Sequence, residues 1–211
     1  MNFNRFGKTG TDEDNFRPLD LSKGDILDLT KVAPSLRNVT LGAGWTMAKS
    51  GDDNFDLDIS AFLLDRDGRV KDPYTQVVYF KQMSQQGIYL EGDNLTGSSE
   101  DSNEDDERIN VALDDIPAEI QSIVFNVNIF EAMEKRQTFG MIRKSYIRLL
   151  DRDNNDRELL RFSLKTDAAS ATALTFAKLE RVNNGWQFHA IGDALTVRDL
   201  NQLLVRYMAF K

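Results

Sequence analysis

The sequence contains no cysteine and only one histidine, His189. The absence of cysteine excludes thiol catalysis, zinc sites with cysteine ligands and iron–sulfur clusters, because each of these uses a cysteine thiolate. A single histidine leaves only one residue for a serine–histidine relay. No apolar run exceeds four residues, so we expect no segment that spans a membrane. Residues 1–17 lack the apolar core of a secretory signal, and we expect a cytoplasmic protein.

The net charge of −8 comes from one short segment. Eight of the 34 acidic residues and none of the 26 basic residues lie within 91–107, which reads EGDNLTGSSEDSNEDDE. The rest of the chain carries 26 acidic residues against 26 basic ones. No basic surplus is left to neutralise phosphates, so we expect no nucleic-acid partner. The concentration of carboxylates indicates a cation site, and a solvated acidic loop is the alternative interpretation.

Alternation of apolar and polar residues dominates the chain. Residues 55–61 read FDLDISA, with apolar residues at the odd positions and Asp56, Asp58 and Ser60 at the even ones. This period of two is typical of a half-buried β-strand with one face in the core. The same alternation recurs over residues 109–113 and 123–129. Further strands are expected over residues 25–30, 37–42, 76–81, 87–91, 141–150, 158–164, 172–182 and 186–191.

Two local signals complete the expected fold. The dipeptide Asn184-Gly185 is typical of a tight hairpin turn. Thr196, with Asp199 three residues later, predicts a helix start, and apolar residues at helical spacing follow between 200 and 208. We therefore expect a mainly β chain, an antiparallel β-sandwich of about ten strands with a short C-terminal amphipathic helix.

Two groups of acidic residues could bind a hard cation. Ca²⁺ takes roughly 6–8 oxygen ligands, and a tight site needs several carboxylates. Asp56 and Asp58 project from one face of a strand about 7 Å apart, close enough to reach one ion or two neighbouring ions. The spacing of acidic residues elsewhere does not match an EF-hand loop. The candidate metal ligands are Asp56, Asp58, Asp93, Asn94, Asp105, Asp106 and Glu107.

Several short motifs occur in a fixed order from about residue 19 to the C-terminus. They are LSKG at 21–24, APSL at 33–36, FDLDISAFLL at 55–64, GDNLTG at 92–97, DDE at 105–107, FG at 139–140 and NGWQF at 184–188. Together these motifs resemble the TerD family, the tellurium-resistance and stress-response domain. The resemblance implies a domain over residues 19–211 and an N-terminal extension over residues 1–18, which we expect to be flexible.

The resemblance also implies a function. Members of this family are calcium-binding β-sandwiches with no established enzymatic activity, associated with tellurite resistance, other chemical stress and phage resistance. Ca²⁺ is thus the implied cofactor. The implied partners are other proteins of a stress-response assembly, in the cytoplasm or at the membrane edge.

One departure from the family's pattern bears on the number of ions. Where the family has two asparagines after the strand that ends near Phe80, this chain has Lys81-Gln82. A lysine cannot ligate Ca²⁺, and its positive charge opposes a second cation nearby. We therefore predict at most one tightly held Ca²⁺.

These observations predict a non-enzymatic Ca²⁺-binding module that acts as a binding or scaffold protein in a bacterial stress response. One alternative is a metal-dependent hydrolase that uses the acidic cluster and an ion-bound water. Against it, the sequence offers no obvious nucleophile–base pair and no Gly-rich phosphate loop. The other alternative is a structural assembly subunit in which the metal only stiffens a loop.

Overall fold

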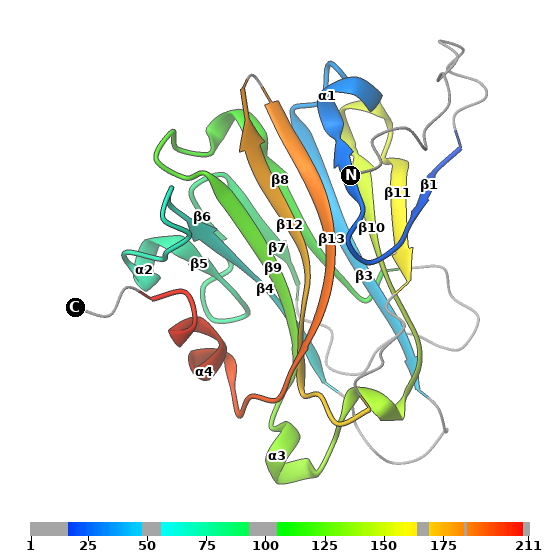
Figure 1. The fold of residues 1–211 in the computed structure, drawn as a ribbon, viewed down its shortest axis with the longest axis vertical. Helices are drawn as coiled ribbons and strands as arrows, with labels where there is room; N and C mark the ends of the chain where they lie inside the picture. The colour runs from blue at the N-terminus through cyan, green and yellow to red at the C-terminus, as the bar shows by residue number, and fades with distance from the viewer. Residues whose placement is uncertain (1–16, 48–55, 93–104, 164–168, 184, 209–211) are drawn as a thin grey trace.

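Two β-sheets form the residues that the computed structural model describes, which are 17–47, 56–92, 105–163, 169–183 and 185–208 (Figure 1). Sheet A contains, in spatial order, β1 (Leu19–Leu21), β11 (Arg157–Ser163), β10 (Ile142–Asp151), β3 (Asn38–Met47), β8 (Glu107–Ala112), β7 (Ile88–Glu91) and β6 (Ser84–Gln85). Sheet B contains β2 (Ile26–Asp28), β13 (Gly185–Leu195), β12 (Ala173–Val182), β9 (Ser122–Ile129), β4 (Leu57–Leu64) and β5 (Val77–Val78). Neighbouring strands are antiparallel, apart from the parallel pair of β1 and β11.

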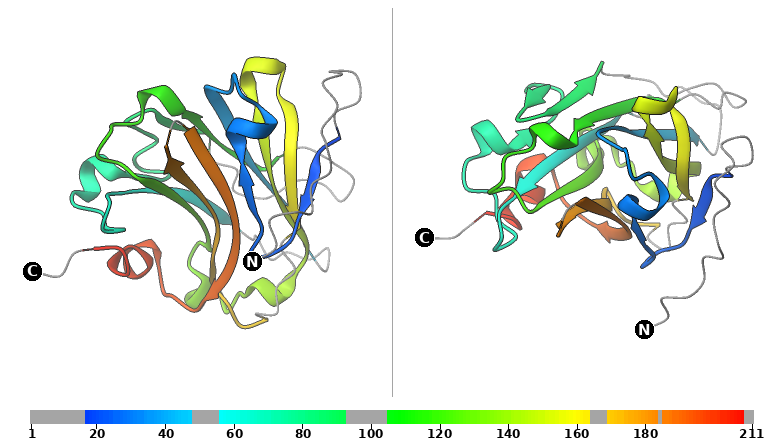
Figure 2. Two further views of the ribbon diagram at one scale, coloured as in Figure 1. Left: turned by 45° about the horizontal axis from the view of Figure 1, so that its top comes forward. Right: turned by 90° about the horizontal axis from the view of Figure 1, so that it is seen from above.

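The expected antiparallel β-sandwich is confirmed. The sheets stack as two layers (Figure 2), and their facing side chains share one apolar core, to which sheet A contributes Leu41 and Ile109 and sheet B contributes Ile59 and Phe125. Two strands were not expected from the sequence, β1 with three residues and β6 with two. The helical segments are α1 (Leu29–Val32), α2 (Pro73–Gln76), η2 (Leu113–Asp115), α3 (Ala132–Lys135), η3 (Phe139–Met141), η4 (Arg152–Asn154) and α4 (Leu200–Val205).

Burial of the two central strands of sheet B differs from the prediction. The alternation predicts half-buried strands over 55–61 and 123–129, but every residue of β4 and β9 is buried. Their odd-numbered residues face the main core. On the opposite face, Phe62 and Val124 pack in a second apolar cluster with Leu203 of α4. The polar residues of β4 therefore lie on a face that is closed to solvent, and not on an exposed one.

The C-terminal helix is present as α4 and supplies part of this cover. The ring of Tyr207, just after the helix, meets that of Phe62 edge-on with centroids 5.6 Å apart. The helix begins later than predicted, because Asp199 and not Thr196 is its N-cap, with a side chain that accepts a hydrogen bond from Gln202 N. The Thr196 hydroxyl is directed instead to the Ser170 carbonyl oxygen.

The hairpin prediction is confirmed, since β12 pairs with β13 and Val182 lies opposite Gly185. The expected strand over 76–81 is limited to Val77–Val78, because residues 79–82 form a tight turn in which Tyr79 and Gln82 exchange backbone hydrogen bonds. The expected strand over 25–30 ends at Asp28, which caps α1. In the described part of the chain, no helix has the length and apolar character needed to cross a membrane.

Candidate metal site

Glu107 of β8, one of the predicted ligands, contacts β4, the strand that carries Asp58. Glu107 is 2% exposed at the start of β8, and its Oε2 accepts a hydrogen bond of 2.7 Å from the backbone N–H of Ile59 in β4. Its carboxylate therefore lies beside the residue that follows Asp58. Asp58 is 7% exposed, and Asp56, just before β4, is 9% exposed. Because β8 belongs to sheet A and β4 to sheet B, the Glu107 bond joins the two layers.

This bond is possible because β4 is only partly covered along one side. β5 pairs with β4 at Ala61 and Phe62. The backbone of Ile59 therefore lies beyond the end of β5, where its N–H is available to a side chain. A strand edge of this kind has backbone donors that must find another acceptor, and the Glu107 carboxylate fills that role.

Asp106 is directed to sheet A. Its Oδ2 accepts a hydrogen bond of 2.8 Å from the backbone N–H of Trp45, and its own N–H donates to the Ala43 carbonyl oxygen. Both partners lie on β3. The Asp106 side chain is 8% exposed, so it is another carboxylate held in the interior. Asp106 and Glu107, though adjacent in sequence, thus contact different sheets.

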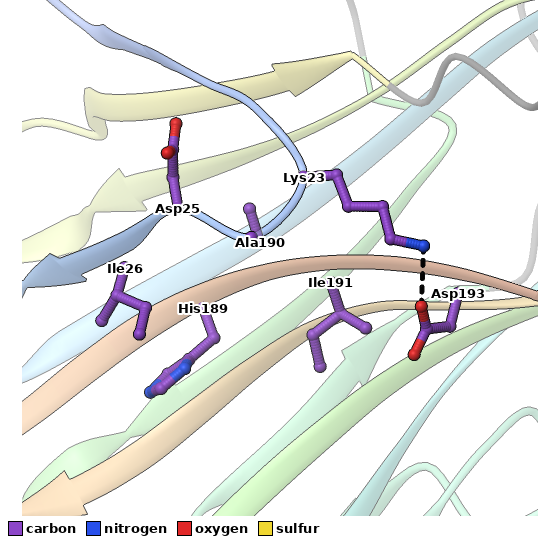
Figure 3. A pocket seen from close by; sticks show the side chains of 8 residues that line it. Lys23, Asp25, Ile26, His189, Ala190, Ile191 and Asp193 are labelled. Atoms are coloured by element: carbon purple, nitrogen blue, oxygen red, sulfur yellow. Dashed lines mark hydrogen bonds and ion pairs between the residues drawn. The ribbon is translucent and has the colours of Figure 1, made fainter. Parts of the chain in front are cut away.

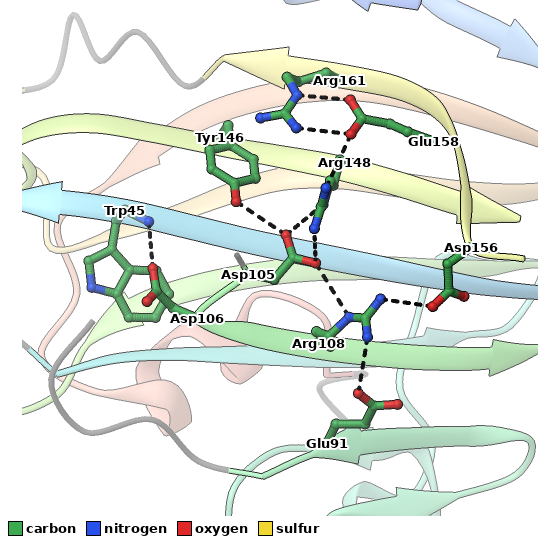
Figure 4. A network of polar contacts seen from close by, with 10 residues as sticks. All are labelled: Trp45, Glu91, Asp105, Asp106, Arg108, Tyr146, Arg148, Asp156, Glu158 and Arg161. Carbon is green, nitrogen blue, oxygen red and sulfur yellow. Dashed lines mark hydrogen bonds and ion pairs between the residues drawn. The ribbon is translucent and has the colours of Figure 1, made fainter. Parts of the chain in front are cut away.

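Asp105 belongs to a network of charged side chains on sheet A (Figure 4). Its carboxylate, 1% exposed, receives two hydrogen bonds from Arg148, from Nε at 2.7 Å and from Nη2 at 3.0 Å. Arg108 Nε lies 3.3 Å from Asp105 Oδ2, and the Tyr146 hydroxyl donates a hydrogen bond of 3.3 Å to Asp105 Oδ1. Two guanidinium groups therefore compensate the charge of Asp105 without a metal ion. Further members are Glu158, which binds Arg148 and Arg161, and Glu91 and Asp156, which bind Arg108.

Two glycines of β3 make room for this network. A Cβ at Gly42 would overlap the Asp105 carboxylate, and a Cβ at Gly44 would lie 2.5 Å from the Tyr146 ring. Burial, together with the negative charge of Asp105, raises the pKa of Tyr146 to about 12, so the phenol keeps its proton and donates it. Burial opposes the charged form of Arg148, but the Asp105 carboxylate outweighs it and raises the pKa of that guanidinium.

The remaining predicted ligands, Asp93 and Asn94, lie outside the described residues. Among the residues whose positions are described, no group of three or more histidine, cysteine, aspartate or glutamate side chains is arranged to hold a metal ion. Ca²⁺ needs roughly 6–8 oxygens. A calcium site at Asp58 and Glu107 would therefore need ligands beyond the described carboxylates.

Two polar residues of β9 near Asp58 were not among the predicted ligands. Asn128 lies opposite Asp58 on β9, and Asn126 lies opposite Ser60. All four side chains are buried. Their alternation with apolar residues was visible in the sequence, but that pattern predicts exposure, and only the cover on the outer face of sheet B reveals their burial.

Lys81 is exposed, and its Nζ lies 5.2 Å from the centroid of the Phe80 ring. The Phe80 ring in turn meets Phe130, whose backbone N–H donates to the Asp56 carbonyl oxygen. The lysine therefore lies at the same end of sheet B as Asp56, with two aromatic rings in between. The limit of one tightly held ion stays a prediction.

The only histidine lies on β13, which β12 and β9 separate from β4. It lines a shallow pocket of about 270 Å³ together with Ile26 and the ion pair of Lys23 and Asp193 (Figure 3). His189 Nε2 lies 2.8 Å from a Glu180 carboxylate oxygen. Burial, reinforced by the charge of Lys178, lowers the pKa of His189 despite Glu180. The histidine is therefore remote from the buried carboxylates.

This histidine predicts a pH dependence of stability. Because its pKa is lowered in the folded state, the unfolded chain takes up the proton first, at its usual pKa of about 6.5. The contribution of His189 is complete above that pH and is lost as the pH falls toward the folded-state pKa. Urea unfolding between pH 5 and 7.5 should show a steeper loss of stability on acidification for the wild type than for His189→Gln. Equal slopes would contradict this assignment.

Comparison with known proteins assigns the family. The family model for the TerD domain matches residues 18–207 of this chain. The chain belongs to the TerD family. It is 39% identical over 175 residues to the tellurium resistance protein TerD of Serratia marcescens, an alignment that covers 82% of this chain and 89% of that protein. It is 38% identical over 176 residues to general stress protein 16U of Bacillus subtilis, with the same coverage of 82% and 89%.

The TerD fold is also matched in a solved structure. The crystal structure of a homologue of telluride resistance protein TerD from Streptomyces coelicolor superposes with a TM-score of 0.63, covering 79% of this chain and 95% of that one. The two sequences are 22% identical, so this likeness supports the fold alone. The TerD resemblance found in the sequence motifs is thus confirmed, and the protein is a relative of tellurium-resistance and stress-response proteins.

Proposed function

We propose that this TerD-family protein is a non-enzymatic Ca²⁺-binding module that acts as a binding or scaffold protein in a bacterial stress response of the tellurium-resistance type. The observation that carries the proposal is the burial of Glu107 against β4 beside Asp58. The names of its relatives, a tellurium resistance protein and a general stress protein, support the biological setting.

Electrostatics supports a cation at this place. A charged carboxylate in the protein interior is stable only when hydrogen bonds or positive charges compensate it. Asp105 has Arg148 and Arg108 for this purpose, and Glu107 accepts a hydrogen bond from the neutral backbone N–H of Ile59. Asp58 brings a second negative charge to the same stretch of β4. A divalent cation with a preference for oxygen ligands fits this donor set.

The ligands that we propose come from both strands and from the acidic segment. Ca²⁺ would neutralise the buried carboxylates and tie β4 to β8. The described carboxylates at the centre of the proposal are Asp58 and Glu107, and Asp56, Asp93 and Asn94 would complete the shell. Asp106, which accepts a hydrogen bond from Trp45 N on sheet A, is left out of it. Asp105 is already bound to Arg148 and Arg108. It is therefore better suited to hold the end of the acidic segment, residues 91–107, against sheet A than to bind the ion.

A structural role for the ion is favoured over a catalytic one. Neither the tellurium resistance protein TerD of Serratia marcescens nor general stress protein 16U of Bacillus subtilis is named for an enzymatic activity. The chain lacks cysteine, and two strands, β12 and β9, lie between His189 on β13 and β4. Ca²⁺-dependent hydrolysis of phosphoesters by the wild type, lost in Asp58→Asn, would instead support the metal-dependent hydrolase.

Titration calorimetry on chelator-treated protein tests the site. We expect one Ca²⁺ to bind tightly and Mg²⁺ to bind more weakly, because Mg²⁺ demands a strict octahedral shell and gives up its waters reluctantly. Asp58→Asn removes a charged ligand and should weaken Ca²⁺ binding by about tenfold or more, equivalent to about 1.4 kcal/mol or more.

The matched control is Glu119→Gln, which removes one negative charge from an exposed position. This variant should bind Ca²⁺ as the wild type does. The absence of binding heat in the wild type, or equal loss of affinity in both variants, would contradict the proposed site. Two tightly bound ions would contradict only the limit that Lys81 predicts.

A further inference from the structure

A cluster of four polar side chains lies on the face of sheet B that points away from the main core. Asp58 is directly opposite Asn128, and Ser60 is directly opposite Asn126, on the neighbouring strands β4 and β9 (Figure 1). Residues directly opposite on antiparallel strands point to the same face, with Cβ atoms about 4.5–5.5 Å apart. Asn128 and Ser60 therefore both border the Asp58 side chain, one across the strands and one along β4.

Two of these side chains carry oxygens without a hydrogen-bond partner. Asn128 is 5% exposed and Ser60 is 0% exposed. Within the described parts of the chain, neither Asn128 Oδ1 nor Ser60 Oγ takes part in a hydrogen bond. Asn126 differs, because its Oδ1 accepts a hydrogen bond of 2.7 Å from the Thr175 hydroxyl. Buried polar atoms in native proteins are almost always satisfied, so these two oxygens indicate a bound species.

We propose that Asn128 Oδ1 and Ser60 Oγ are further ligands of the ion bound at Asp58, so that the calcium site extends from β4 onto β9. This inference rests on the calcium site proposed above. Amide and hydroxyl oxygens are hard, neutral donors of the type that Ca²⁺ combines with carboxylates. They add coordination without adding negative charge to an interior that already holds Asp56, Asp58 and Glu107.

The rigidity of the two strands favours this assignment. β4 and β9 are central strands of sheet B and pair along the whole length from Leu57–Ile129 to Leu64–Ser122. Side chains on such strands are held in place better than side chains on loops. Asp58, Ser60 and Asn128 would thus form a preorganised part of the shell, to which the rest of the ligands are added.

The test compares Asn128→Leu with the wild type in two conditions. Leucine has nearly the shape of asparagine but no oxygen. In excess chelator the variant should melt at the same temperature as the wild type or higher, because an unsatisfied buried oxygen has been removed. With Ca²⁺ the variant should melt at a lower temperature than the wild type. Calorimetry should show that the variant binds Ca²⁺ about tenfold more weakly. Asn128→Asp, which keeps an oxygen ligand, should retain tight binding.

Ser60→Ala provides a second measurement, with Ser122→Ala as its matched control. Ser122 is also buried on the same face of β9, at the opposite end of the strand. We expect Ser60→Ala to weaken Ca²⁺ binding about threefold, or about 0.65 kcal/mol, and Ser122→Ala to leave it unchanged.

The outcomes separate this inference from the proposed function. If the wild type binds Ca²⁺ and Asn128→Leu binds it equally well, the inference is wrong and the calcium site stands without it. If Asn128→Leu lowers the melting temperature equally with Ca²⁺ and with chelator, a buried water satisfies the oxygen and the inference is again wrong. If the wild type binds no Ca²⁺, both the inference and the proposed function are overturned.

Discussion

In millimolar Ca²⁺ the protein should melt about 10 °C higher than in excess chelator. A ligand that binds only the folded state at about 1,000 times its dissociation constant stabilises it by ~4 kcal/mol. For a chain of this size each kcal/mol raises the melting temperature by about 2–4 °C. The reason to expect a large effect is the burial of Asp58 and Glu107, whose carboxylates the proposed Ca²⁺ would neutralise.

Thermal melts followed by circular dichroism measure this difference. Mg²⁺ at the same concentration is the control for ionic strength and charge, and it should raise the melting temperature less. Asp58→Asn should narrow the gap between Ca²⁺ and chelator, whereas Glu119→Gln should leave it unchanged. Superimposable melts of the wild type in Ca²⁺ and in chelator would contradict the calcium proposal.

Replacement of Arg148 by methionine should destabilise the protein by about 3 kcal/mol even in excess chelator. Removal of one partner of a buried ion pair leaves an uncompensated charge in the interior, which typically costs about 3–5 kcal/mol. Asp105 is 1% exposed, and Arg148 supplies both of its guanidinium hydrogen bonds, so the expected effect falls in this class. We expect the lower end of the range because Arg108 stays within 3.3 Å.

Urea unfolding of the single and double variants measures the effect. Arg148→Met combined with Asp105→Asn should recover much of the lost stability, because the stranded charge is removed as well. Lys23→Met is the control, since the Lys23–Asp193 pair is 61% exposed on both sides and such surface pairs contribute about 0–1 kcal/mol. A cost for Arg148→Met no larger than that of Lys23→Met would contradict the role of this ion pair.

The strand pattern of this protein could be predicted because it depends on local alternation. The hairpin of β12 and β13 has the same origin, since an Asn-Gly pair favours the turn that joins them. The burial of both faces of β4 could not be predicted in this way. It depends on the segment around Leu203 and Tyr207, about 140 residues later in the chain, which covers the outer face of sheet B.

The residues of the candidate site could also be predicted only in part from the sequence. The carboxylates of Asp58, Asp105 and Glu107 could be identified from the sequence, because they belong to the motifs FDLDISAFLL at 55–64 and DDE at 105–107. It could not assign their partners. Asp105 meets Arg148 only because β3, with glycines at positions 42 and 44, lets the two side chains approach across the sheet. Glu107 meets β4 only because the two sheets stack.

A crystal structure of the protein grown in Ca²⁺ would show whether an ion binds beside β4. We expect an ion with oxygen ligands at about 2.3–2.6 Å, a distance range typical of calcium. Carboxylate oxygens of Asp58 should lie in its shell, and Asn128 Oδ1 should lie there as well. Absence of an ion beside Asp58 in crystals saturated with Ca²⁺, or an ion bound only by exposed acidic residues away from β4, would contradict the proposed calcium site.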